Sequence, residues 1–461
     1  MDYSKSVFLA LLISVVFACG KTDEEHNGIF SERGKIGLFE IWNDVTEGLS
    51  NFANVIASVE NVLSVLSENN QSIIIEDDIV SPDTFLHITE LAAKYGYRVE
   101  EHKIITEDGY ILTVHRLRGR NAAQNTSKVV FLMHGIVDSS DSWLLQGPDN
   151  ALGYILADNS FDVWMGNARG NKHSLAHTTL DPKESDFWDF TWEEIGIYDL
   201  PAMIDHVLNV TKKQSLYYIG YSQGTTIFYV MNSMKPEYNE KVKTMFSLAP
   251  VAWMSNVKSP LVKLFSPPHN IIGYLFTNFN TKSPSTEFFN KVAALFCSYL
   301  QVRCGGLLNM IGGYDYKNIN GTLIPVIFGH MPTGASTLQF VHYGQLVESG
   351  RFARFDFGSI RNFKDYGQSS PPDYDVTKIS VPIQMFYSDR DWLSAESDVD
   401  LLKKKLPNVV GCNFIKGFHH LDYTYASRAK IEVYDKIMIK IDETENENKK
   451  FDYKTTVQNI I

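Results

Sequence analysis

The chain has 461 residues, long enough for one large domain with an appendage or for two domains. An apolar fraction of 44% and a charged fraction of 21% are typical of a globular protein with a packed core, which excludes a disordered chain. The net charge of −12 argues against nucleic acid as a partner and against electrostatic binding to anionic membranes.

Residues 1–20 have the pattern of a secretory signal peptide. Lys5 precedes an apolar run from Val7 to Cys19 that is too short to span a bilayer, and small residues stand at 18–20. We expect cleavage near 18–20; lipidation of Cys19, as in a bacterial lipoprotein, is the alternative. No other segment is predicted to cross a membrane. Four glycosylation sequons agree with eukaryotic secretion, at Asn70, Asn125, Asn209 and Asn320.

Three cysteines remain after Cys19. In an oxidising compartment we expect the close pair Cys297 and Cys304 to form a small disulfide loop and Cys412 to stay free. Three buried thiols are the alternative. Because no Cys-x-x-Cys or His-x-x-x-His spacing accompanies these cysteines, we predict no metal site and no cofactor.

An N-terminal extension at 21–77 contains a regular apolar stripe. Between Trp42 and Leu66, apolar side chains recur at steps of three and four residues, which predicts one face of an amphipathic helix. Such a helix would lie on the protein's own surface, cover an apolar active-site mouth as a pro-segment, or contact lipid or a partner. The sequence does not decide between these alternatives.

Residues 78–441 have the pattern of an α/β domain. A helix starts at Ser81-Pro-Asp83 and ends near Gly96, and a hairpin follows in which Glu107-Asp-Gly109 separates two strands. The strands are expected at Val99–Thr106, Tyr110–Leu117, Val129–Met133, Asp162–Met165, Leu216–Ile219, Thr244–Leu248, Ile383–Tyr387 and Val409–Ile415. The later helices are expected at about Thr191–Leu208, Gln223–Met234, Glu396–Lys405 and Tyr425–Ile441. Short apolar strands alternating with amphipathic helices predict a mostly parallel sheet covered on both faces.

Two segments depart from this alternation. Residues 251–345 are rich in Phe, Leu, Pro and Gly and contain the cysteine pair, so we interpret them as a cap inserted at the carboxyl edge of the sheet. Such a cap would shield an apolar substrate site from water. The tail at 442–461 is polar and charged and is predicted to be disordered.

The stretch Gly220-Tyr-Ser-Gln-Gly224 lies between a buried strand and a helix-compatible segment. Strand, Gly-x-Ser-x-Gly and helix together are the nucleophile elbow of α/β-hydrolases, in which a strained turn exposes the serine. The pentapeptide alone would occur by chance in roughly one chain in seven of this length. The pentapeptide therefore indicates a catalytic serine only if the chain also carries partners for Ser222 in the order serine, acid, histidine.

Those partners follow in the expected order. Only two histidines come after the last acid-bearing strand, His419 and His420, so one of them is the expected base. The strand before them ends in Ser388-Asp-Arg-Asp391, and a carboxylate there would orient the imidazole. Spacing does not separate Asp389 from Asp391, nor His419 from His420.

An oxyanion hole needs two backbone donors. One would be the N–H of Gln223, directly after the nucleophile, and the other comes from the loop after an early strand. Met133-His-Gly-Ile136 ends such a strand, where Gly135 lets the loop turn so that the Ile136 N–H points inward. We interpret His134 as a structural turn residue, because it precedes the serine in the chain.

Taken together, these motifs make the chain resemble the acid lipase family, which includes gastric and lysosomal lipases and insect homologues. The resemblance covers about residues 82–440. It rests on Tyr97, Ile105–Leu112, Met133–Ile136, Asp162–Asn171, Phe187–Trp188, Tyr198–Asp205, Gly220–Gly224, Gly329–Ser336, Asp391–Leu393 and His420–Asp422.

This resemblance implies Ser222 as nucleophile, Asp391 as acid and His420 as base, with Gln223 and Ile136 as oxyanion donors. Two positions depart from the family pattern. Ile136 replaces the usual leucine, which has no consequence where only the N–H is used. His419 stands where an acidic residue is common, so the family's acidic pH optimum is not carried over to this chain.

The expectation is therefore a secreted or lysosomal serine ester hydrolase acting on acylglycerols or sterol esters, a lipid substrate met at an interface. One alternative is a hydrolase for small esters or thioesters. Another is a hydrolase-fold protein that binds lipid without catalysis, because a fold does not determine a function.

Overall fold

The computed structural model describes residues 81–120, 128–259 and 318–458, with a few single positions between 262 and 313; beyond 447 it describes only the backbone. The expectations for the signal segment, the 42–66 stripe, Asn70, Asn125 and Cys304 lie outside the described residues.

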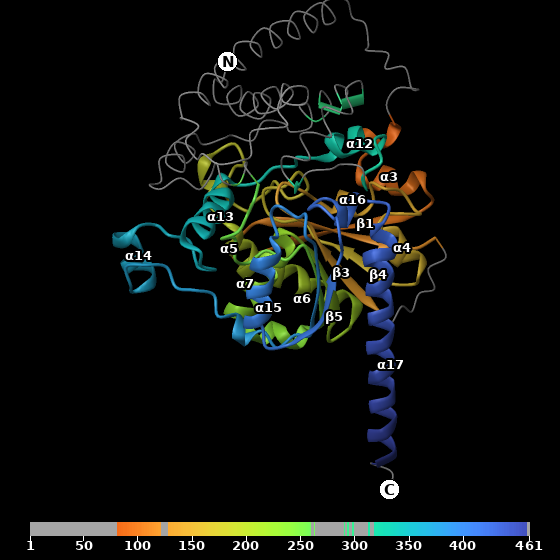
Figure 1. The fold of residues 1–461 in the computed structure, drawn as a ribbon. Helices are drawn as coiled ribbons and strands as arrows, with labels where there is room; N and C mark the ends of the chain where they lie inside the picture. The colour runs from red at the N-terminus through yellow and green to blue at the C-terminus, as the bar shows by residue number, and fades with distance from the viewer. Residues whose placement is uncertain are drawn as a thin grey trace, which may run out of the picture.

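Eight strands form one sheet in the order β1-β2-β4-β3-β5-β6-β7-β8 (Figure 1). They are β1 (Arg98–Ile105), β2 (Ile111–Arg118), β3 (Val129–Met133), β4 (Asp162–Met165), β5 (Leu216–Tyr221), β6 (Val242–Leu248), β7 (Ile383–Tyr387) and β8 (Val409–Phe414). β2 pairs antiparallel with β1 and β4, whereas all the other neighbouring strands are parallel. The predicted α/β-hydrolase fold with a mostly parallel sheet is confirmed.

Helices and short helical turns connect these strands. The α-helices are α3 (Ile88–Lys94), α4 (Leu152–Asp158), α5 (Trp192–Glu194), α6 (Leu200–Thr211), α7 (Gln223–Met234), α12 (Leu323–His330), α13 (Thr337–Ser349), α14 (Ser359–Tyr366), α15 (Glu396–Lys405), α16 (Asp422–Tyr425) and α17 (Asp435–Gln458). The shorter 3₁₀ and π segments are η1 (Pro82–Thr84), η2 (Ser140–Trp143), η3 (Ser185–Trp188), η4 (Ile195–Asp199), η5 (Pro236–Lys241), η7 (Val376–Lys378) and η8 (Lys430–Tyr434).

The sheet separates two hydrophobic cores. Side chains of a strand alternate between faces, so Phe131 and Met133 of β3 join the core under α6, α7 and α15. Val130 and Leu132 join the opposite core, which is covered by α3, α4, α12 and α17. All five β3 residues are buried, which explains why the central strands have continuous apolar sequences.

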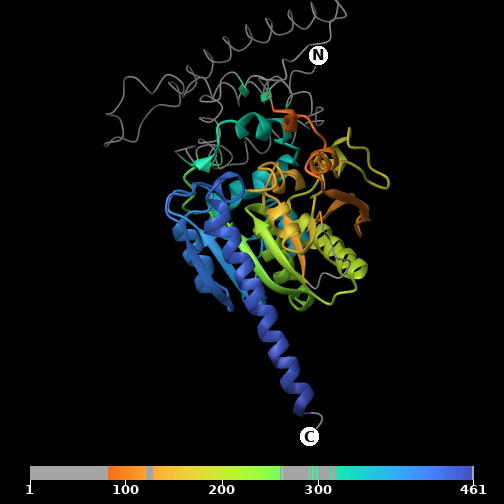
Figure 2. The same cartoon turned by 90° about the vertical axis from the view of Figure 1, so that its right-hand side faces the viewer.

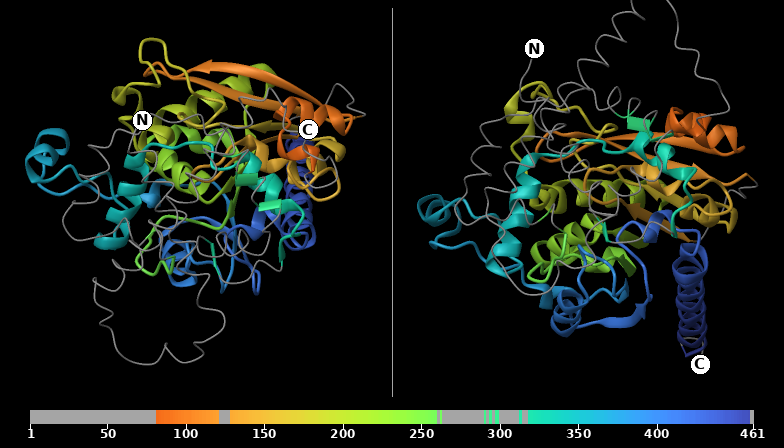
Figure 3. Two further views of the ribbon diagram at one scale, coloured as in Figure 1. Left: turned by 90° about the horizontal axis from the view of Figure 1, so that it is seen from above. Right: turned by 45° about the horizontal axis from the view of Figure 1, so that its top comes forward.

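The described part of the cap lies over the carboxyl edge of the sheet. Contacts of α13 with α7, and of the α12–α13 connection with the loop after β3, place these segments above the strand ends. Figures 1 and 3 show α12 and α13 on this side, and α14 projecting from the side of the domain.

Within the expected helix at 191–208, the structure has a π turn, η4, between α5 and α6. Pro201 lies at the start of α6 and has no N–H to donate to the preceding turn. The Leu200 N–H instead bonds to the Ile195 carbonyl five residues earlier. A proline at this position therefore widens the turn without ending the helix.

The prediction that the tail at 442–461 is disordered is wrong for most of that segment, because α17 continues to Gln458. The helix projects beyond the sheet (Figures 1 and 2). Glu445 accepts a hydrogen bond of 2.8 Å from the Tyr217 hydroxyl and forms an ion pair with Lys243 at 2.5 Å. Asp442 is ion-paired with Lys128. These contacts join the polar side of the helix to the amino ends of β3, β5 and β6, which a local sequence pattern does not reveal.

Candidate active site

Ser222 occupies a strained turn between β5 and α7. Its backbone angles are φ 52° and ψ −115°, a conformation that non-glycine residues adopt at a cost of roughly 1–3 kcal/mol. A Cβ on Gly220 would lie 2.7 Å from the Gly224 carbonyl oxygen, and one on Gly224 would lie 2.4 Å from the Met133 carbonyl oxygen. Both glycines are therefore required by close backbone packing around the serine.

The structure brings Ser222, His420 and Asp391 together from three separate loops. The Ser222 Oγ lies 2.7 Å from Nε2 of His420. The Nδ1 of the same ring lies 2.9 Å and 3.0 Å from the two carboxylate oxygens of Asp391. A carboxylate only accepts, so Nδ1 carries the proton and Nε2 is left to accept the Ser222 hydroxyl proton.

The structure also separates the residues that spacing left open. Asp391 is held by the backbone N–H groups of Leu393 at 2.9 Å and Ser394 at 2.8 Å. Asp389 accepts instead from the Gly417 backbone N–H at 2.7 Å. The backbone N–H of His419 donates to the carboxylate of Asp422 at 2.8 Å.

The two expected oxyanion donors flank the serine. Gln223 is the first residue of α7, where a backbone N–H has no partner within the helix. A Cβ on Gly135 would lie 3.3 Å from the Cβ of Ser222, so the loop that carries Ile136 passes directly beside the nucleophile. This arrangement could bind a negatively charged oxygen on the carbon that Ser222 attacks.

His134 in this loop has a structural role, as the sequence order indicated. Its Nδ1–H donates to the Gly135 carbonyl at 2.7 Å, and Nε2 accepts the Ala168 N–H at 3.1 Å. Burial lowers the pKa of His134 to about 4, so the ring is neutral near pH 7. Both ring nitrogens are occupied by backbone groups.

The cap contributes contacts to the site that the sequence did not indicate. The Gly312 carbonyl accepts the backbone N–H groups of His420 at 3.1 Å and Trp392 at 3.2 Å, which joins the two loops carrying the base and the acid. The Gln223 side chain donates to Gln339 of α13 at 2.7 Å. The feature of the sequence that could have indicated this close contact is the pair of adjacent glycines at 312 and 313. A Cβ on Gly313 would lie 2.5 Å from the Arg390 carbonyl oxygen, so this position requires a glycine.

In the loop after β3, residues 134–139, which we call the oxyanion loop, Asp138 is buried, and this burial raises its pKa to about 7. The backbone N–H of Ser139 donates to its carboxyl at 2.6 Å, and the Ser142 hydroxyl donates to the same oxygen. These hydrogen bonds favour the ionised form but do not offset the loss of solvation.

Asp138→Asn should remove one contribution to the pH dependence of stability between pH 4 and 8. The pKa of Asp138 is about 7 in the folded protein against an ordinary value of 3.8, so the unfolded chain loses this proton first as the pH rises. The contribution of Asp138 to the free energy of unfolding therefore falls across this range, by roughly 2–4 kcal/mol. Asparagine keeps the acceptor oxygen and has no proton to lose, so this decline should be absent.

Thermal unfolding at pH 4, 6 and 8 measures the difference between Asp138→Asn and wild type. The exposed residue Asp149 supplies the control, and Asp149→Asn should follow the wild-type curve. An Asp138→Asn protein whose Tm changes with pH in parallel with wild type would show that this carboxyl does not titrate in the range.

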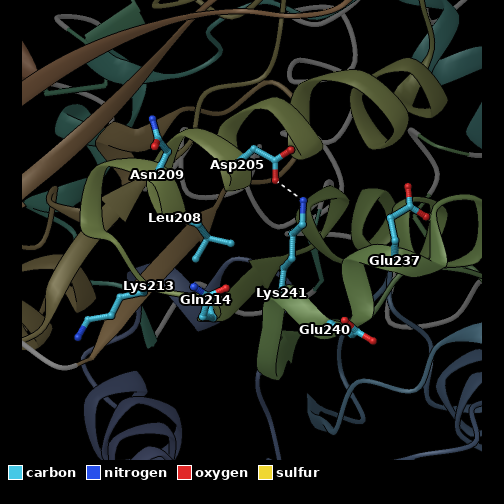
Figure 4. A pocket seen from close by; sticks show the side chains of 8 residues that line it. All are labelled: Asp205, Leu208, Asn209, Lys213, Gln214, Glu237, Glu240 and Lys241. Carbon is cyan, nitrogen blue, oxygen red and sulfur yellow. Dashed lines mark hydrogen bonds and ion pairs between the residues drawn. The ribbon is translucent and has the colours of Figure 1, made fainter.

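The described residues also form a separate groove of about 480 Å³, whose lining side chains are drawn in Figure 4. It is lined by Asp205, Leu208, Asn209, Lys213, Gln214, Glu237, Glu240 and Lys241. Gln214 and Lys241 lie within two residues of the amino ends of β5 and β6, whereas Ser222 follows the carboxyl end of β5. Charged walls do not suit an acyl chain, so this groove is not part of the candidate active site.

Some expected modification sites fall within the described residues. Asn209, which lines the groove, and Asn320 are exposed, so both remain predicted glycosylation sites. Cys297 is disulfide-bonded and Cys412 is a free, exposed cysteine. Pairing of Cys297 with Cys304 stays a prediction, because Cys304 lies outside the described residues.

Two general features concern the residues that the structure describes. No helix among them is both long and apolar enough to cross a bilayer. Within the same part of the chain, no cluster of His, Cys, Asp and Glu side chains is arranged to hold a metal ion.

Comparison with known proteins agrees with this architecture. The family model of the partial alpha/beta-hydrolase lipase region matches residues 88–147, and that of the alpha/beta hydrolase fold matches residues 128–280. The first match spans the hairpin and the oxyanion loop, and the second includes the serine elbow.

Three lipases align over most of the chain. Lipase 1 of Drosophila melanogaster is 40% identical and covers 78% of this chain and 80% of its own. Human gastric triacylglycerol lipase is 38% identical, with 79% and 92% covered. Human lysosomal acid lipase/cholesteryl ester hydrolase is 36% identical, with 78% and 91% covered. This chain therefore belongs to the acid lipase family of α/β-hydrolases, together with the gastric, lysosomal and insect lipases.

Proposed function

We propose that this protein is a serine ester hydrolase that cleaves acylglycerols or sterol esters through an acyl-enzyme on Ser222. The observation that carries the proposal is the continuous hydrogen-bonded chain from Ser222 through His420 to Asp391, at a strained elbow. The substrate class is supported by the relatives, whose names give triacylglycerol and cholesteryl ester as substrates.

In the first half of the reaction, Ser222 Oγ attacks the ester carbonyl carbon while Nε2 of His420 takes the hydroxyl proton. Asp391 stabilises the imidazolium that forms. The carbonyl oxygen becomes negatively charged and accepts hydrogen bonds from the backbone N–H groups of Gln223 and Ile136. The C–O bond to the alcohol then breaks, and His420 returns its proton to the leaving alcohol.

In the second half, water attacks the acyl carbon of the acyl-serine. His420 takes a proton from this water and later gives it to Ser222 Oγ, which releases the carboxylic acid. His420 therefore acts first as a base and then as an acid in both halves, whereas Ser222 attacks in the first half and leaves in the second. The reaction needs no metal or redox group, since every step is a proton transfer or an acyl transfer.

We further propose a secreted or lysosomal location, with residues 1–20 removed as a signal peptide. The apolar run from Val7 to Cys19 and the gastric and lysosomal lipases among the relatives support this proposal. N-terminal sequencing of the protein from a secreting eukaryotic host tests it. A chain that retains Met1 would contradict it.

Hydrolysis of p-nitrophenyl esters with two to sixteen carbons, between pH 4 and 8, tests the substrate class. We expect kcat/KM to rise with chain length, because each buried methylene contributes about 0.8 kcal/mol to binding of the acyl group. A preference for two to four carbons would favour a small-ester hydrolase instead. Absence of turnover on every ester would favour a lipid-binding protein without catalysis.

A further inference from the structure

His330, the last residue of α12, and residues 331–336, which connect it to α13, form a strap across the oxyanion loop. It is anchored at both ends. The ring nitrogens of His330 lie 2.8 Å from the Asp141 carboxylate and 2.8 Å from the Asp83 carbonyl oxygen. The Ser336 hydroxyl donates to the Trp188 carbonyl at 2.7 Å. The middle of the strap is therefore held in a defined place relative to the hydrolase core.

Thr333, at the centre of the strap, contacts the oxyanion loop through two hydrogen bonds. Its backbone N–H donates to the Val137 carbonyl at 2.9 Å, and its hydroxyl donates to the Asp138 carbonyl at 2.7 Å. The residue is only 1% exposed, so water does not compete for these bonds. The Asn171 side chain also donates to the Asp138 carbonyl, but over a longer distance of 3.3 Å.

The loop needs such support because its backbone is strained directly after Ile136. Val137 has a φ of 54°, which is a rare and costly conformation for a β-branched residue. A strained conformation persists only when surrounding contacts determine it. Because Ile136 is covalently joined to Val137, contacts that fix the Val137 and Asp138 peptides also limit how far the Ile136 N–H can rotate.

We propose that Thr333 is a positioning residue for ester hydrolysis, holding the oxyanion loop so that the Ile136 N–H faces the reacting oxygen. This inference rests on the proposed function, in which Ile136 is an oxyanion donor. Thr333 acts through the loop and does not touch substrate. An oxyanion donor is most important when charge develops on the oxygen, so loss of its alignment should lower kcat and leave KM nearly unchanged.

Thr333→Val tests this role, because valine keeps the shape and the backbone N–H and removes only the hydroxyl. Complete loss of an oxyanion donor lowers kcat by about 10²–10³-fold, so a misaligned donor should lower it by about 10–100-fold, with KM within about threefold. Thr333→Ser keeps the hydroxyl and should retain kcat within about threefold of wild type. The assay is steady-state hydrolysis of p-nitrophenyl butyrate, with Tm measured for each variant.

Ser336→Ala is the matched control. It also removes one buried hydroxyl from the strap, but the partner of that hydroxyl is Trp188, outside the oxyanion loop. The Ser336 hydroxyl also accepts the Leu338 N–H at the start of α13, so Tm should fall in this variant. Its kcat should stay within about threefold of wild type.

Three results would overturn the inference: wild-type kcat in Thr333→Val, an equal loss of kcat in Ser336→Ala, or an equal loss in Thr333→Ser. The second would show that any loosening of the strap suffices. A short-chain preference in the wild type would contradict the proposed substrate but leave this comparison intact, because all variants are compared on one ester.

Discussion

Replacing Ser222 with alanine should lower kcat by about 10⁴-fold or more, the loss seen when a serine triad loses its nucleophile. Without Oγ no acyl-enzyme can form, and the remaining oxyanion donors can only assist direct attack by water. The strained turn is set by Gly220, Gly224 and the ends of β5 and α7, so the variant should fold. Hydrolysis of a p-nitrophenyl ester and labelling by a fluorophosphonate both measure the loss.

Ser233 provides the control for this experiment. It lies on the same helix, α7, is buried, and its hydroxyl donates to the Val230 carbonyl at 2.9 Å. Ser233→Ala should keep turnover within a few-fold of wild type. If Ser222→Ala also did so, or if the fluorophosphonate still labelled it, another residue would be the nucleophile.

Replacing Asp391 with asparagine should lower kcat by about 10³–10⁴-fold. The carboxylate accepts the proton on Nδ1 of His420, whereas the amide can present an N–H there. The ring would then keep its proton on Nε2, which could not accept the proton of Ser222. Because asparagine retains one oxygen for the backbone N–H groups of Leu393 and Ser394, the loop should keep its shape.

Asp389→Asn is the matched control, two residues away on the same loop. The Asp389 carboxylate accepts the Gly417 backbone N–H and has no hydrogen bond with His420 among the described contacts. Its kcat should stay within a few-fold of wild type. Equal losses in the two variants would assign the effect to the loop as a whole, and a larger loss in Asp389→Asn would reverse the assignment of the acid.

The sequence predicted the central strands well, because their signal is local. Each is a short apolar run bounded by polar or turn residues, and β3, β4 and β7 have the predicted bounds. Burial on both faces of a parallel sheet makes such runs continuous, so composition alone identifies them. The sequence was less informative where distant residues decide the outcome, as in the tail, where Tyr217 and Lys243 bind Glu445 of α17.

By itself, the sequence determined the α/β architecture, the serine elbow and the order of serine, acid and histidine along the chain. It left two pairs of neighbouring residues open, which the resemblance to the acid lipases separated and which differ in the structure by their hydrogen bonds. Only the tertiary structure decided how the cap takes part. Gly312 joins the loops of the acid and the base, and Thr333 binds the loop of Ile136. These contacts join residues far apart in the chain through backbone carbonyl groups, which every residue carries, so no side-chain pattern marks them in advance.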